Sequence, residues 1–148
     1  PLPISPYGMT KLAGENLAYL YHRKFGVPTV SLRFFTVYGP RQRPDMAFHI
    51  FCRALLEGKA INIFGDGEQS REFTFVHDVV RAIIAAGAKG TPGEVYNVGG
   101  GGEVTVNEAI QILREVSGKD TEVRYGESMA GDARRAGYID EKPALDGG

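Results

Sequence analysis

The chain has 148 residues, of which 43% are hydrophobic and 24% are charged, with a net charge of -1 and an isoelectric point near 6.4. This balance fits a folded unit with a hydrophobic core, and it offers no general attraction for nucleic acid or for an anionic membrane. The apolar runs are far shorter than the ~20 residues that cross a bilayer, and Cys52 is the single cysteine, so we expect no transmembrane helix, no intramolecular disulfide and a cytoplasmic location.

The first part of the chain predicts a helix, a strand and a second helix. Ser5 suits a helix N-cap, and apolar residues follow it at helical spacing until Gly26. The segment TVSLRFF at 29–35 is β-branched and aromatic, which is typical of a strand buried on both faces of a parallel sheet. The basic loop GPRQRPD then leads into a helix that we expect from about Met46 to Glu57.

The second part continues the alternation of strands and helices. A GDG turn separates two predicted short strands, INIF and REFTFV. We then expect a helix at HDVVRAIIAAGAK, a buried strand at EVYNVGG, and a strand entering a helix at VTVNEAIQILREVSG, with Asn107 as its cap. Helix and buried strand in alternation indicate an α/β protein with a doubly wound parallel sheet.

Tyr7 and Lys11 stand four residues apart on the first predicted helix, so their side chains share one face. A tyrosine has an ordinary pKa of ~10, and lowering this pKa to near 7 takes about 4 kcal/mol of preferential stabilisation of the phenolate. An ammonium ~5 Å away, at an effective dielectric of ~20, supplies about 3 kcal/mol. A second positive charge, such as an oxidised nicotinamide, would complete the shift. Alone, the spacing is more typical of a surface aromatic beside a solvated lysine than of a catalytic pair.

Other chemistry is not favoured by the sequence. No glycine-rich turn with dinucleotide spacing follows a predicted strand. The run Gly99–Gly102 lacks the Lys-Ser/Thr ending of a phosphate-binding loop, and we interpret it as a flexible turn. The residues His22, His49, His77 and Cys52 show no paired ligand spacing, so we expect no metal site.

Five segments occur in the order seen in one enzyme family: SPYGMTKLAGE, LRFFTVYGPRQRPDMAFH, INIFGDGEQSREFTFVHDVV, VYNVGGG and GDARRAGYID. The chain resembles the extended short-chain dehydrogenase/reductase family, and within it the C-terminal half of the NAD-dependent nucleotide-sugar epimerases and dehydratases. The resemblance runs from Ser5 to about Asp140. It is nearest to UDP-glucuronate 4-epimerases, because Thr36 stands where hexose epimerases commonly carry asparagine.

This resemblance implies the C-terminal part of a Rossmann-like, doubly wound sheet plus a small α/β substrate-binding domain. Residues 1–40 correspond to the dinucleotide-binding core, and residues 41–148 mainly to the nucleotide-sugar-binding domain, with 71–100 returning to the core sheet. NAD is the implied cofactor, and we expect its glycine-rich turn in an N-terminal half outside this sequence. Without that half, the core strands and helices are expected to expose apolar surface. A homodimer packed through the Tyr7 helix is also implied.

The resemblance also assigns catalytic roles. Tyr7 matches the family's catalytic tyrosine, which removes the proton from the sugar 4-hydroxyl as hydride passes to the nicotinamide. Lys11 matches the lysine that lowers the pKa of that tyrosine and binds the cofactor ribose. Thr36 and Arg43 match positions near the sugar, and we expect them to hold a sugar carboxylate, with Arg41 as the competing arginine.

The remaining assignments concern the nucleotide. Arg71 and Arg134 match arginines that contact the diphosphate, Asn62 and Phe64 match the segment that lines the uracil, and Asp132 matches a position beside a ribose hydroxyl. Without the resemblance, the arginines would be interpreted as solvated surface charges and Phe64 as a core residue.

The resemblance therefore predicts that the parent polypeptide is an NAD-dependent UDP-sugar 4-epimerase, which interconverts UDP-glucuronate and UDP-galacturonate through a 4-keto sugar. One alternative is a 4,6-dehydratase or decarboxylase of the same family. The other is an inactive, truncated module that binds UDP-sugars or forms a dimer. We expect the isolated chain to lack activity.

Overall fold

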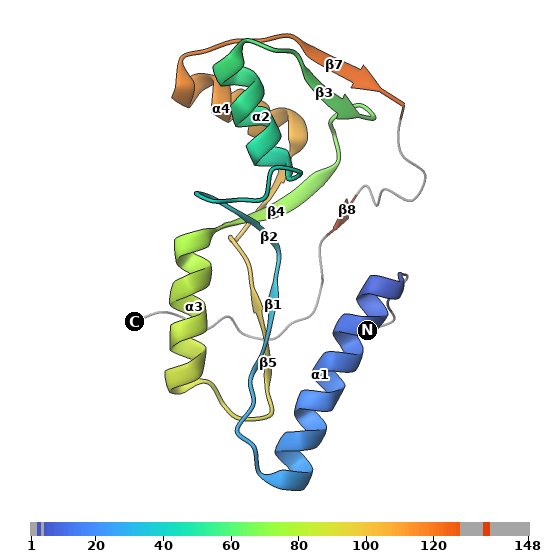
Figure 1. The fold of residues 1–148 in the computed structure, drawn as a ribbon, viewed down its shortest axis with the longest axis vertical. Coiled ribbons are helices and arrows are strands. Elements are labelled where there is room, and N and C mark those ends of the chain that lie inside the picture. The colour runs from blue at the N-terminus through green and yellow to red at the C-terminus, as the bar shows by residue number, and fades with distance from the viewer. Residues whose placement is uncertain (1–2, 4, 128–134, 137–148) are drawn as a thin grey trace. The chain divides into compact units, whose positions relative to one another are not determined.

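The computed structural model describes residues 3, 5–127 and 135–136. The chain divides into two compact units (Figure 1). The first unit comprises residues 1–34, 77–98 and 141–148, and the second comprises residues 35–76 and 99–140. In the described part of the chain, no helix is both long enough and apolar enough to cross a membrane.

The first unit begins with the predicted helix, α1, at Pro6–Phe25. The Ser5 hydroxyl caps it by accepting the backbone N–H of Gly8 at 3.0 Å, and the helix ends at Gly26, whose φ of 68° is a left-handed conformation that glycine adopts without strain. Both ends were predicted correctly. The segment after α1 packs back on the helix, where the Thr29 hydroxyl donates a hydrogen bond to the Ala18 carbonyl at 3.0 Å.

The same unit contains a parallel strand pair, β1 (Ser31–Phe34) and β5 (Val95–Val98), and the helix α3 (Val76–Lys89). β1 is shorter than predicted, and it is not buried on both faces: Phe34 is 44% exposed, and the residues of β5 are half-buried. In the described residues this sheet consists of two strands, so each strand has one hydrogen-bonded neighbour, whereas the inner strands of a wider doubly wound sheet have two.

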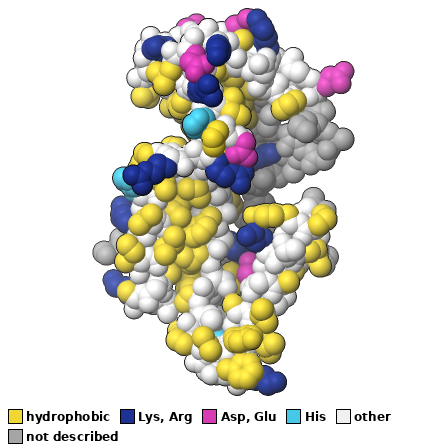
Figure 2. Space-filling model, viewed as in Figure 1, with side chains coloured by type: hydrophobic (Ala, Val, Ile, Leu, Met, Phe, Trp, Pro, Cys, Tyr) yellow, Lys and Arg dark blue, Asp and Glu magenta, His cyan; other side chains and the backbone are white. Residues whose placement is uncertain are grey.

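Large apolar side chains are exposed on the helices of this unit, as predicted. On α3 they are Val80, Ile83 and Ile84, and on α1 they include Leu17, Leu20 and Phe25. Figure 2 shows hydrophobic side chains gathered over both helices. Patches of this kind are uncommon on soluble monomers and are typical of surfaces that pack against other protein.

The second unit is built on a sheet in which β4 (Ser70–Phe75) is central. β2 (Thr36–Tyr38) and β8 (Arg135–Ala136) pair with it in parallel, and β6 (Glu103–Thr105) pairs with it in antiparallel fashion. Two ring contacts tie this sheet to the helix α2 (Ala47–Glu57): Tyr38 stacks on Phe48 at 4.8 Å, and Phe48 meets Phe73 edge-on at 4.8 Å. Within the sheet, Tyr38 contacts Phe75 at 5.5 Å.

A smaller layer completes the second unit. The parallel strands β3 (Ile61–Phe64) and β7 (Val123–Gly126) turn one face toward α2 (Ala47–Glu57) and α4 (Val106–Ser117). The core lies between them and consists of Phe51, Ala54, Leu55, Ile61, Ile63 and Ile110. The two strands predicted on either side of the GDG turn, β3 and β4, are present, but they do not pair with each other. β3 pairs with β7, and β4 pairs with β2.

One predicted cap is wrong. α4 is capped by Thr105, whose hydroxyl accepts the Glu108 backbone N–H at 3.1 Å, while the Glu108 carboxylate accepts the Thr105 backbone N–H at 2.8 Å. This reciprocal capping box leaves Asn107 inside the first turn of the helix. The backbone hydrogen bond from Thr105 also lowers the pKa of Glu108.

The glycine run at 99–102 is a close-packed turn rather than merely a flexible one. The Glu72 carboxylate accepts the Gly101 backbone N–H at 3.0 Å. A Cβ atom at Gly100 would lie 2.2 Å from the Phe73 carbonyl oxygen, so only glycine allows the loop to approach β4 this closely.

Candidate functional site

Tyr7 and Lys11 lie on the same face of α1. The Lys11 ammonium is 5.2 Å from the centre of the Tyr7 ring, and Tyr7 is 71% exposed. The phenol is therefore open to solvent, and a positive charge lies close to its ring. Tyr7 is also at the N-terminal end of the helix.

The helix that carries this pair is fastened to β1 by a half-buried ion pair. Arg33 on β1 donates two hydrogen bonds to Glu15 on α1, at 2.9 and 2.8 Å, and the two side chains are only 25% and 20% exposed. Such bidentate pairing fixes both direction and distance. The sequence offered no signal for it, because the partners are separated by 18 residues.

Thr36 begins β2 and pairs with Phe73 of β4. Because side chains alternate along a strand, Arg71 lies on the same face of β4 as Phe73. Thr36 and Arg71 therefore belong to one face of one sheet, and both are half-buried. The Arg71 guanidinium donates to the Ser70 carbonyl at 2.8 Å.

Arg43 lies in the loop between β2 and α2 and forms a bidentate pair with Asp45, at 3.1 and 2.8 Å. Both side chains are exposed, at 75% and 66%. The neighbouring Arg41 has a φ of 67°, a left-handed conformation that is unusual for a residue with a side chain and that marks a constrained turn.

Gln42 fixes this loop at both ends. Its amide group donates to the Val37 carbonyl at 2.9 Å and accepts the His49 backbone N–H at 3.1 Å. The loop borders an open cavity of about 580 Å³, which is also lined by Phe48 and Cys52. Burial raises the pKa of the Cys52 thiol, so this cysteine has little thiolate character at neutral pH.

Asn62 and Phe64 occupy the face of β3 that points away from the core, because Ile61 and Ile63, which alternate with them along the strand, are buried. Phe64 is 58% exposed, so the alternative interpretation of Phe64 as a core residue is wrong. An exposed aromatic ring beside an amide is suited to stacking on a planar base and bonding to its edge.

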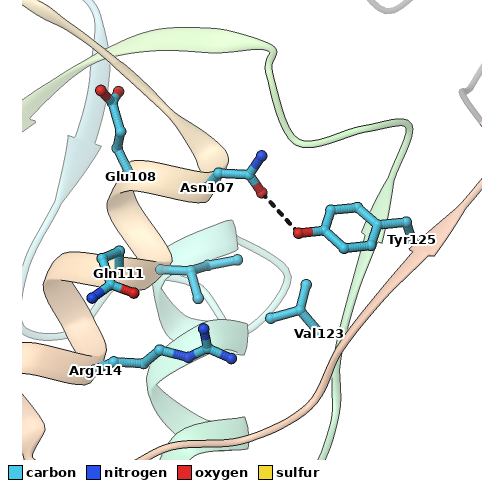
Figure 3. Close-up of a pocket in the computed structure, with 7 residues that line it drawn as sticks. Asn107, Glu108, Gln111, Arg114, Val123 and Tyr125 are labelled. Atoms are coloured by element: carbon cyan, nitrogen blue, oxygen red, sulfur yellow. Dashed lines mark hydrogen bonds between the residues drawn. The ribbon is translucent and has the colours of Figure 1, made fainter.

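The turn that follows Phe64 is clamped by Asn107 from α4. The Asn107 amide donates to the Asp66 carbonyl at 3.0 Å and to the Glu68 carboxylate at 2.7 Å, and Gly67 packs so closely that a Cβ atom there would lie 2.1 Å from the Asn107 oxygen. Tyr125 on β7 donates to the same oxygen at 3.3 Å (Figure 3). Asn107 therefore ties the turn, α4 and β7 together, a role that the predicted helix cap did not anticipate.

Figure 3 also shows Arg114 and Gln111 lining the same pocket of about 360 Å³. Arg114 is engaged in the loop after α4, where its guanidinium lies 2.8 Å from Asp120 and donates to the Thr121 carbonyl. This pocket lies on the α4 side of β7, and Asn62 and Phe64 are on the other face of the strand pair.

The two remaining predicted site residues, Asp132 and Arg134, lie outside the described residues. The others fall into two groups: Tyr7 and Lys11 belong to the first unit, and Thr36, Arg43, Asn62, Phe64 and Arg71 belong to the second. Among the described residues, no group of three or more His, Cys, Asp or Glu side chains is arranged to hold a metal ion.

Residues 1–99 match the model of the NAD dependent epimerase/dehydratase family. The chain belongs to this family. A relative described as the uncharacterized UDP-glucose epimerase YtcB of Bacillus subtilis (strain 168) is 47% identical over 131 residues, which are 88% of this chain and 42% of the relative. The UDP-glucuronate 4-epimerase of Thermodesulfobacterium geofontis (strain OPF15) is 43% identical over 124 residues, covering 83% of this chain and 38% of that protein.

Solved structures give the same result. The UDP-glucuronic acid 4-epimerase from Bacillus cereus, in complex with UDP-glucuronic acid and NAD, superposes with a TM-score of 0.82 at 47% identity over 90% of this chain and 43% of the other. The expected α/β fold with Rossmann-like parallel pairing is thereby confirmed, as is the resemblance to NAD-dependent nucleotide-sugar epimerases. The chain spans less than half the length of these epimerases.

The residues present fit one end of an NAD molecule. Lys11 and Tyr7 offer an exposed ammonium and phenol, which suit the ribose and nicotinamide. The pyrophosphate requires a glycine-rich turn between a strand and a helix. In the described residues β4 runs directly into α3, and β6 runs directly into α4, so neither connection offers such a turn.

Proposed function

We propose that the parent polypeptide of this chain is an NAD-dependent UDP-sugar 4-epimerase acting on UDP-glucuronate and UDP-galacturonate. The observation that carries the proposal is the exposed Tyr7 phenol with the Lys11 ammonium 5.2 Å from its ring. NAD, when bound, supplies the acceptor and then the donor of a hydride at the sugar C4.

Tyr7 is the general base in the first half-reaction. Its phenolate takes the proton of the sugar 4-hydroxyl as that carbon is oxidised to a ketone, and it returns the proton after the 4-keto sugar has turned its other face. Lys11 favours the phenolate through its charge, and its ammonium hydrogens are available to the hydroxyls of the cofactor ribose.

The second unit binds the substrate. Arg71 suits a diphosphate, since a guanidinium is always charged and binds phosphate oxygens through two parallel hydrogen bonds. Phe64 and Asn62 suit the uracil, one by stacking and the other by hydrogen bonding. Asp132 is proposed to bind the ribose and Arg134 the diphosphate, on the basis of the family resemblance alone.

Thr36 and Arg43 are proposed to select the uronate. A hydroxyl and a guanidinium together provide the donors that a C6 carboxylate requires, and a neutral hexose would leave the cation without a partner. Two of the similar proteins, those of T. geofontis and B. cereus, are UDP-glucuronate 4-epimerases, which supports this choice of sugar.

The apolar residues exposed on α1 support a homodimer packed through the Tyr7 helix, and those on α3 support coverage by the remainder of the parent protein. The cytoplasmic location stays a prediction.

The test is to assay the full parent protein with UDP-glucuronate and NAD, in wild-type form and as Tyr7→Phe. We expect conversion to UDP-galacturonate by the wild type and a loss of at least about 100-fold in kcat for the variant, which is the usual range for removing a general base. A variant with full turnover would remove Tyr7 from the mechanism. A product that has lost water or carbon dioxide would identify a dehydratase or decarboxylase instead.

A further inference from the structure

Ionisable residues follow one another along α1 at intervals of four, beginning with Tyr7, Lys11, Glu15 and Tyr19. Lys11 therefore has a phenol one turn before it and a carboxylate one turn after it, and both can reach its ammonium. A carboxylate is the stronger partner, because it is fully ionised at neutral pH whereas a phenol is not. If Glu15 held Lys11, the positive charge beside Tyr7 would be drawn away and partly neutralised.

In the structure, Glu15 is turned to another cation. Arg33 on β1 binds both of its carboxylate oxygens, at 2.9 and 2.8 Å, and the pair is largely screened from solvent. Among the described residues, no carboxylate forms an ion pair with Lys11, whose ammonium lies over the Tyr7 ring instead.

Glu15 is the one acidic side chain of α1. On α1, Tyr19 stands one turn beyond Glu15 and is exposed, and His22 follows on the half-buried side, where its ring nitrogen lies 3.1 Å from the Val27 carbonyl. Of the segments packed on α1, β1 supplies Arg33, and the contacts from Thr29 and Gly93 bring no charge.

We propose that Arg33 is a positioning residue for the reaction: it sequesters Glu15 and thereby reserves the Lys11 ammonium for Tyr7. The inference rests on the proposed role of Tyr7 as the base. It differs from a purely structural function of the ion pair, in which Arg33 and Glu15 only fasten α1 to β1. In that case either partner could be removed with the same effect, and the acidity of the phenol would not respond.

The two functions are separated by removing the partners singly and together. Loss of Arg33 frees Glu15 to bind Lys11, so the pKa of Tyr7 rises. Loss of Glu15 removes the competitor, so the pKa of Tyr7 stays or falls slightly, although the fastening is lost equally. Loss of both partners leaves no competitor for Lys11, so the pKa of Tyr7 should be the same as after loss of Glu15 alone.

The experiment uses the full parent protein with NAD and the UDP-sugar it converts. The variants are Arg33→Gln, Glu15→Gln and the double variant, and Arg23→Gln is the control, because it removes an exposed arginine from the same helix. The readout is the pH dependence of kcat/KM, whose acid limb reports the base of the free enzyme. We expect Arg33→Gln to raise that pKa by about 0.5 to 1 unit, and the other variants to leave it unchanged or lower.

An unchanged acid limb in Arg33→Gln, or a raised limb in the double variant, would overturn the proposal. If Arg33→Gln does not fold, Arg33→Lys keeps the charge but loses the bidentate grip. For Arg33→Lys we expect a smaller rise in the same pKa, and no rise would again contradict the proposal. Full turnover by Tyr7→Phe would instead show that the proposed function itself is wrong.

Discussion

Arg43 and Asp45 are joined by two hydrogen bonds, at 3.1 and 2.8 Å, so the guanidinium proposed to bind the sugar carboxylate is already paired with a carboxylate of its own loop. Both partners are exposed, and such a pair contributes about 1 kcal/mol or less. A substrate carboxylate can displace Asp45 at small cost. The internal pair holds the guanidinium in a fixed orientation until the substrate arrives.

Replacing Arg43 tests this role. In the parent protein, Arg43→Gln should raise KM for the uronate substrate roughly 10- to 100-fold, since a hydrogen bond to a charged group contributes about 1.5–3 kcal/mol. Arg41→Gln is the matched control, because it removes the same charge two residues away, and it should change KM less than about threefold. Asp45→Asn should lower KM slightly. If Arg41→Gln has the larger effect, the two arginines have been assigned in the wrong order.

Replacing Asn107 tests how the turn after β3 is held. Asn107→Ala removes two hydrogen bonds to residues 66 and 68 and one from Tyr125, so it should destabilise the protein by about 1–3 kcal/mol and weaken UDP binding. Gln111→Ala is the control on the same helix, and it should cost less than about 0.5 kcal/mol because Gln111 is exposed. Chemical denaturation and calorimetric titration with UDP measure both effects. Equal losses in the two variants would contradict the clamp.

We predict that stability depends on pH through Glu57, which pairs with Arg53 and Lys59 at the exposed end of α2. Hydrogen bonds from Lys59 and then Arg53 lower the pKa of Glu57 from 4.5 to about 2. Because the folded state has the lower pKa, the stabilisation is fully present above pH 4.5 and is lost as the pH falls toward 2. The difference in Tm between wild type and Glu57→Gln should therefore be constant near neutral pH and vanish near pH 2. If the Tm difference instead grows as the pH falls, the pH dependence has the opposite sign and contradicts the prediction.

Much of the fold could be predicted because local signals and tertiary structure agree. Ser5 and Gly26 delimit α1 through capping geometry that depends only on the residues at its ends. The cap of α4 was available too, since Thr105 and Glu108 have the spacing of a capping box, but Asn107 was preferred on residue type alone. The burial of β1 was overestimated, because burial depends on which strands and helices lie beside it.

The candidate site was predictable where a motif carries it and not where it depends on distant partners. Tyr7 and Lys11 follow from helical spacing, which fixes their common face. The pair of Glu15 with Arg33 and the contacts of Asn107 with residues 66 and 68 join segments 18 or more residues apart, for which a single sequence has no periodic signal. These supporting contacts are where the structure adds most.

The central claim is that the Lys11 charge makes the Tyr7 phenol acidic enough to act as a base near neutral pH. The most direct measurement is the pH dependence of kcat/KM for Lys11→Met in the NAD-loaded parent protein, with wild type in parallel. We predict that the pKa of the acid limb rises by about 2 units, since an ammonium ~5 Å away contributes about 3 kcal/mol. An acid limb at the wild-type position, with activity retained, would contradict the account.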